Sequence, residues 1–113
     1  MRVLVCGGRD YWDKATIRKE LAEVKPTVVL HGAASGADRL AGEVATEMKV
    51  PVEEYPARWN DYGRAAGIIR NQMMLTHGKP DLVLAFPGGR GTADMVQRAQ
   101  KAGVPVRIVS EEN

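Results

Sequence analysis

A loop with three glycines in four positions is the stretch of this sequence best suited to bind a ligand. The apolar run over residues 82–86 leads through the loop 87–92 into residues 93–102, which are compatible with a helix. A buried strand that ends in such a loop places backbone N–H groups at the positive end of the helix dipole, where they can hold an anion such as a phosphate. Glycine is needed there because a Cβ would keep the ligand away from the backbone. The competing interpretation is a tight turn without a ligand.

Two further loops of small residues also follow apolar runs. Residues 3–6 end at the loop 7–10, and residues 27–30 end at the loop 31–38. Continuous runs rich in β-branched residues are typical of strands buried on both faces. In a parallel sheet, the three loops share one edge, where ligands of open α/β sheets bind. The sequence therefore predicts a pocket for a nucleotide or a sugar phosphate, held largely by the backbone.

Charged and hydroxyl side chains complete this candidate site. Arg9, Arg70 and Arg90 are the guanidinium groups that we expect near a phosphate, since each can hold two oxygen atoms at once. Ser35 and Thr92 lie where a hydroxyl either caps a helix or donates to a phosphate. The predicted ligand-binding residues are Gly7, Gly8, Arg9, Gly32, Ser35, Gly36, Arg70, Asn71, Pro87, Gly88, Gly89, Arg90, Gly91 and Thr92.

Other polar residues near the loops have structural alternatives. We expect Asp38 to bind Arg39 or a backbone amide, and Asp94 to face the pocket, although acids are favoured in any first helical turn. His31 is expected to be a structural histidine in preference to a catalytic one. Cys6, at the end of a core strand, is expected to be an inert buried thiol.

Aromatic residues lie beside the same predicted edge. Tyr11 and Trp12 either stack on a base or pack the edge of the domain. Trp59 is expected to be partly exposed and to contribute to an aromatic wall.

The elements that must position these residues alternate between strand and helix. This alternation predicts an α/β fold with a five-stranded parallel sheet covered by helices on both faces. The paired glutamates of residues 51–55 place that strand at a sheet edge. A stripe of Leu40, Val44 and Met48 is expected to face the sheet. Strands are predicted over residues 3–6, 27–30, 51–55, 81–86 and 104–109, helices over 14–24, 62–77 and 92–102 and around this stripe, and irregular structure over 56–61.

Size and composition limit the remaining possibilities. The 113 residues predict a single domain over residues 1–113, and a net charge of +2 is too small to argue for nucleic acid. One cysteine and two histidines without ligand-like spacing predict no metal site, and we expect no cofactor. The apolar runs are short and no signal peptide is visible, so we expect a cytoplasmic protein.

At this point the motifs resemble a known family. Residues 87–92 match the Pro-Gly-Gly-x-Gly-Thr signature of the lonely-guy (LOG) phosphoribohydrolases and of the wider SLOG superfamily, and residues 70–74 resemble that family's Arg-Lys-x-x-Met segment. With the loops 6–10 and 31–38, the pattern is most similar to the small YspA-type SLOG proteins of bacteria and phages. The resemblance implies a Rossmann-like three-layer sandwich that binds the phosphoribosyl group of a nucleotide or nucleotide-derived ligand, as a sensor or binding domain.

The resemblance also implies alternatives. LOG enzymes cleave the N-glycosidic bond of a nucleoside 5′-monophosphate, and their motif continues to a catalytic glutamate, where this chain has Met95. A thioether can neither accept a proton nor stabilise an oxocarbenium-like centre. Arg70, with Asp94 as a substitute acid, is therefore the catalytic pair of the alternative hypothesis, a LOG-like phosphoribohydrolase. Binding of single-stranded DNA ranks last, because no basic stripe is interleaved with aromatic residues.

The related families form dimers, so the resemblance implies a homodimer as well. Met73, Met74 and Met95 are the candidates for an apolar interface, and core packing is the simpler explanation for all three.

Overall fold

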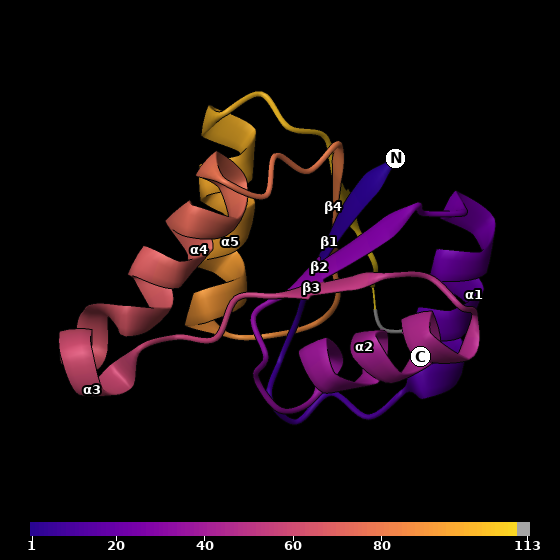
Figure 1. Cartoon of the computed structure of the whole chain (residues 1–113), viewed down its shortest axis with the longest axis horizontal. Coiled ribbons are helices and arrows are strands. Elements are labelled where there is room, and N and C mark those ends of the chain that lie inside the picture. The colour runs from indigo at the N-terminus through magenta and orange to yellow at the C-terminus, as the bar shows by residue number, and fades with distance from the viewer. Residues whose placement is uncertain (111–113) are drawn as a thin grey trace.

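A computed structural model describes residues 1–110 and contains a five-stranded sheet whose paired strands are all parallel (Figure 1). The strands are β1 Arg2–Cys6, β2 Val28–His31, β3 Val52–Glu54, β4 Leu82–Ala85 and β5 Val106–Ile108. Their order is β3-β2-β1-β4-β5, so β3 lies at an edge as predicted. Leu4 of β1 pairs with Leu30 on one side and with Val83 on the other. The strand order therefore reverses between β1 and β4, where open α/β sheets bind ligands.

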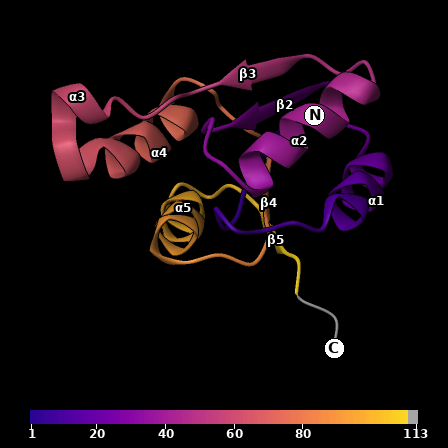
Figure 2. The same cartoon turned by 90° about the horizontal axis from the view of Figure 1, so that it is seen from below.

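Helices cover both faces of this sheet and make the predicted Rossmann-like three-layer sandwich (Figure 2). One face carries α1 and α2, and the other carries α4 and α5. The helices are α1 Lys14–Val24, α2 Ala37–Glu47, α3 Trp59–Tyr62, the 3₁₀ turn η1 Gly63–Ala65, α4 Ala66–Thr76 and α5 Arg90–Lys101. No helix within residues 1–110 is long and apolar enough to cross a membrane.

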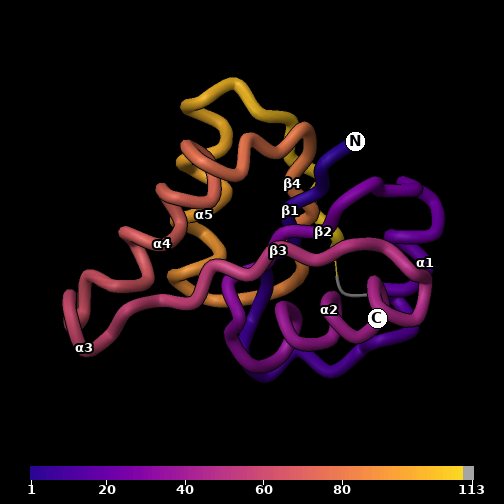
Figure 3. The backbone as a smooth tube through the Cα atoms, in the orientation of Figure 1, coloured from indigo at the N-terminus to yellow at the C-terminus, as the bar shows by residue number. Residues whose placement is uncertain are grey.

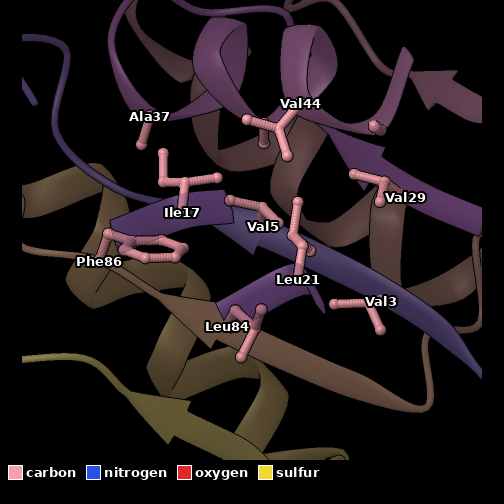
Figure 4. Packing of buried hydrophobic residues seen from close by; sticks show 11 residues of the cluster. Val3, Val5, Ile17, Leu21, Val29, Ala37, Val44, Leu84 and Phe86 are labelled. Carbon is pink, nitrogen blue, oxygen red and sulfur yellow. The ribbon is translucent and has the colours of Figure 1, made fainter. Parts of the chain in front are cut away.

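Two apolar clusters, one on each face of the sheet, form the core. Successive side chains of a strand point to opposite faces, so Val3 and Val5 belong to one cluster while Leu4 and Cys6 belong to the other. Ile17 of α1 packs in the first cluster (Figure 4). The continuous apolar run of β1 thus follows from burial on both faces.

Local signals explain where α1 and α2 begin and how closely they approach the sheet. The carboxylate of Asp13 accepts a hydrogen bond from the Thr16 amide at 3.1 Å, which caps α1 as its residue type suggests. In α2 the predicted stripe packs on the core, because Val44 is buried in the first cluster and the half-buried Leu40 and Met48 pack against it. Small residues, Ala37 and Ala41 among them, complete the buried face of this helix.

The largest difference from the predicted elements lies between β3 and α4. Residues 56–61, expected to be irregular, include the start of α3, and the helix expected over residues 62–77 is divided into α3, η1 and α4. Gly63 interrupts the helix with a φ of 55°, a left-handed conformation that favours glycine. The break carries α3 away from the sheet, as the tube in Figure 3 shows. The polar sequence after Val109 predicts a tail over residues 110–113, of which all but Ser110 lies outside the described residues.

Candidate functional site

The three loops of small residues meet at the carboxyl edge of the sheet, as predicted. The amide of Gly8, after β1, donates to the carbonyl of Pro87, after β4, at 2.8 Å. The carbonyl of Gly8 accepts from the amide of Ala37, at the start of α2, at 3.1 Å. The hydroxyl of Ser35 donates to the carbonyl of Arg9 at 3.3 Å. The backbone of the first loop therefore joins the second and third loops.

Close packing between loops explains several of the glycines. A Cβ on Gly7 would lie 2.6 Å from the Cβ of Ala37, and one on Gly88 would lie 2.7 Å from the amide nitrogen of Gly8. Gly36 has a φ of 74°, and its Cβ would lie 2.2 Å from the Gly8 carbonyl oxygen. These glycines allow one loop to touch the next, which is a requirement of the fold and needs no ligand.

Gly89 and Gly91, at the start of α5, differ from the other loop glycines. A Cβ on either would meet no heavy atom within 4 Å, and both residues are exposed. Gly89 is the N-cap of α5, and no side chain caps that helix. The amides of this first turn therefore lie at an open surface, beside the exposed Arg90.

The second loop uses its own amides internally. The carboxylate of Asp38 accepts from the amides of Gly32 at 3.0 Å and Ala34 at 3.3 Å, and Nδ1 of His31 accepts from the amide of Ala33 at 2.9 Å. Asp38 and His31 are both buried, and both have the structural role expected of them. These three amides already have acceptors within the protein, so they are not available to a ligand as the prediction of a backbone phosphate site requires.

A pocket of about 320 Å³ lies beside this loop. It is lined by Arg9, Gly32, Ala33, Ala34, Ser35, Pro56, Ala57, Trp59 and Arg70, and we call it the Arg9–Arg70 pocket. None of these residues is acidic, and neither arginine lies within 4.0 Å of a carboxylate oxygen of residues 1–110. Sequence reasoning missed Pro56 and Ala57, which follow an edge strand and belong to no motif.

Arg70 of α4 is held rigidly at the base of this pocket. Its Nη1 donates to the carbonyl of Gly32 at 2.5 Å, and its Nε donates to the side-chain oxygen of Asn71 at 3.1 Å. Gly32 has no room for a Cβ, because the guanidinium group lies in that space. Burial lowers the pKa of Arg70; the nearby Asp38 opposes this shift, and the positive charge of Arg9 adds to it. The protein thus holds this cation in place with carbonyl and amide oxygens alone.

Arg9 and Trp59 form the outer part of the pocket. The guanidinium carbon of Arg9 lies 5.6 Å from the centroid of the Trp59 ring, a cation–π contact. Trp59 is 47% exposed, as predicted, and it comes from α3. Tyr11 instead packs against Phe86 in the core at a centroid distance of 5.4 Å, and Trp12 is 81% exposed.

Asn71 connects Arg70 to the start of α5. This buried amide accepts from Arg70 and donates to the carbonyl of Gly91 at 3.1 Å and to the carboxylate of Asp94 at 3.0 Å. Asp94 is also paired with Arg98 at 2.9 Å, and it does not line the Arg9–Arg70 pocket. The two residues of the predicted catalytic pair are therefore separated by Asn71, whose polar atoms have protein partners.

The remaining predicted residues have different surroundings. Ser35 and Thr92 do not cap helices, because the N-cap positions belong to Gly36 and Gly89, so the capping interpretation is wrong for both. A Cβ on Gly88 would lie 2.3 Å from the Thr92 hydroxyl oxygen, which places Thr92 against the third loop.

Three sulfur-containing residues, Cys6, Met74 and Met95, are part of the core. Met74 and Met95 are buried there, whereas Met73 is 40% exposed, so only Met73 is available to an interface. Burial raises the pKa of the Cys6 thiol to about 12, in agreement with an inert buried thiol.

Comparison with known proteins agrees with the motifs and the fold. Residues 1–62 match the model of the YspA, cpYpsA-related SLOG family. The chain is also similar to the gene 61 protein of Mycobacterium phage D29, with 40% identity over 117 residues that cover 93% of each protein. The family match includes β1, β2 and the loops that follow them, and so contains Arg9 and the Gly32–Ser35 side of the pocket. The chain therefore belongs to the YspA, cpYpsA-related SLOG family.

Proposed function

We propose that this protein binds a small phosphorylated ligand, a nucleotide or a nucleotide-derived molecule, in the Arg9–Arg70 pocket. The observation that carries the proposal is the presence of two guanidinium groups, one from the loop after β1 and one from α4, in one pocket without an acidic residue in its lining. Like charges repel, so a pocket with two unpaired cations favours an anion that neutralises both. Membership of the SLOG family supports a nucleotide-related ligand.

The two arginines suit different parts of such a ligand. Arg70 is fixed by Gly32 and Asn71, so it needs little reorganisation to hold a phosphate. Arg9 is exposed and touches the ring of Trp59, so it can turn towards an incoming anion. The open first turn of α5 is joined to Arg70 through Asn71 but does not line the pocket.

Thermal unfolding with added ligand tests the proposal. We expect AMP, ADP-ribose or ribose 5-phosphate at millimolar concentration to raise the Tm, because a ligand at 100 times its Kd adds about 2.7 kcal/mol to the free energy of unfolding. Arg70→Gln should abolish the shift. Arg39→Gln should retain it, because Arg39 is an exposed residue that pairs with Glu43 on α2. The absence of a shift with every member of a nucleotide and sugar-phosphate panel would contradict the proposal.

We propose binding in preference to LOG-like hydrolysis. Met95 occupies the position of the family's catalytic glutamate and is fully buried in the core. Asp94 forms an ion pair with Arg98. Incubation with nucleoside monophosphates followed by chromatography should yield no free base. Release of base that is lost in Asp94→Asn would favour the enzyme instead.

A further inference from the structure

We infer that the ligand of the Arg9–Arg70 pocket carries an aromatic base, and that this base stacks on the indole ring of Trp59. This inference rests on the proposed function and deepens it, because it selects nucleotides over sugar phosphates without a base. Trp59 belongs to none of the three glycine loops and not to the arginine segment that suggested a phosphate site. Its place in the pocket is a property of the tertiary structure.

The position of α3 is the first observation. This short helix lies at the far end of the molecule from α1 and packs against η1 and α4 (Figures 1 and 2). Its first residue, Trp59, lines the pocket together with Ala57, and its ring contacts the guanidinium group of Arg9. A large apolar ring that remains 47% exposed at the rim of a cationic pocket is a surface on which a planar group can pack.

The contact with Arg9 is the second observation. A guanidinium group 5.6 Å from the centroid of the ring shows that a planar cation fits against this indole. A nucleobase can occupy the same face, and Arg9 would then be released from the ring to pair with a phosphate. The base and the phosphate of one ligand would thus replace one cation–π contact with a stacking contact and an ion pair.

Trp12 provides a matched control within the chain. It is the other of the two tryptophans, it is 81% exposed, and it does not line this pocket. Exposure of a tryptophan therefore does not by itself indicate a site. The coincidence of Trp59 with two unpaired arginines distinguishes it from Trp12.

The experiment compares AMP with ribose 5-phosphate in a Trp12→Phe background, where Trp59 is the single tryptophan. By calorimetry we expect AMP to bind about tenfold more tightly, as one base–aromatic stacking contact predicts. Trp59→Ala should remove this preference, so that AMP and ribose 5-phosphate bind with similar affinity, while Trp59→Phe should retain most of it. AMP should also quench the fluorescence of Trp59, and ribose 5-phosphate should not.

Each contrary result has a distinct meaning. Equal affinities for AMP and ribose 5-phosphate in the parent would overturn the inference and leave the proposed function intact. An equal loss of both affinities in Trp59→Ala would also overturn it, since Trp59 would then only shape the pocket. Binding of neither ligand would overturn the proposed function itself. If Trp59→Ala does not fold, the ratio of the two affinities in the parent and in Trp59→Phe decides.

Discussion

The glycine loops and the Arg9–Arg70 pocket lie at the same edge of the sheet but satisfy their polar groups in opposite ways. In the loops, glycines let backbones touch, and the amides of Gly8 and of Gly32 to Ala34 donate to acceptors within the protein. In the pocket, two cations have no carboxylate partner among residues 1–110, and a tryptophan stays half-exposed. The comparison teaches that the backbone of a glycine-rich loop can serve the fold while side chains at the same edge of the sheet, Arg9 and Arg70 among them, provide the capacity to bind.

The strongest test of this difference is the stability of two alanine variants. Gly36→Ala should lower the free energy of unfolding by roughly 2–4 kcal/mol, because the new Cβ meets a carbonyl oxygen and the φ of 74° is unfavourable for alanine. Gly91→Ala, where the Cβ meets nothing within 4 Å, should change it by less than about 1 kcal/mol, since alanine favours the helix. Urea unfolding measures both, and similar losses would contradict the distinction.

The next effect concerns the two arginines. Arg70→Gln should weaken binding of a phosphorylated ligand by about 10- to 100-fold, as expected for loss of a charge-assisted hydrogen bond. Arg9→Gln should weaken it less, because Arg9 is exposed and is not fixed by the backbone. Titration calorimetry at two salt concentrations compares them. An undiminished affinity in Arg70→Gln would remove the pocket from the binding mechanism.

A smaller effect is expected when the pH is lowered, because protonation of His31 should reduce the free energy of unfolding. His31 accepts a hydrogen bond within the second loop. Burial lowers the pKa of His31, while Asp38 and Glu54 oppose this shift and Arg70 adds to it. At His31 the folded protein therefore binds fewer protons than the unfolded chain, so the contribution of this group to stability is complete above about pH 6.5 and falls as the pH drops below it. Protonation would also abolish the acceptor of the Ala33 amide.

Unfolding by urea at pH 7.5 and pH 5.5 checks this expectation. The free energy of unfolding should be smaller at the lower pH, by no more than about 1.4 kcal/mol, the limit for one histidine over this interval. His31→Gln should reduce this dependence, whereas substitution of the exposed His77 by Gln should leave it unchanged. Retention of the full dependence in His31→Gln would show that another group is responsible.

The smallest effect on stability is expected at Met73, which stays a candidate for the predicted homodimer. We propose that its exposed side chain contributes to a contact between two copies of the chain. Met73→Glu should favour the monomer in light scattering after size-exclusion chromatography, with a change in unfolding free energy of no more than about 0.5 kcal/mol per subunit. A wild-type protein that is monomeric at high concentration would refute the proposal.

The sequence by itself determined the α/β class, the alternation of strands and helices that gives a parallel sheet, the shared edge of the three loops and the N-cap of α1 at Asp13. These features depend on local patterns that act over a few residues, namely apolar runs, glycines at the ends of strands and helices, and a capping side chain. The division of the predicted helix over residues 62–77 was harder to see, because a single Gly63 decided it.

Only the tertiary structure decided which polar groups remain available. Asp38 accepts hydrogen bonds from the amides of Gly32 and Ala34. Asn71 separates Arg70 from Asp94, and Arg9 contacts the ring of Trp59. No sequence motif relates the residues that these contacts bring together. Such contacts depend on strand register and on how helices lie against the sheet. A hydrogen bond is made or lost over less than an ångström, so sequence spacing alone cannot assign the partners.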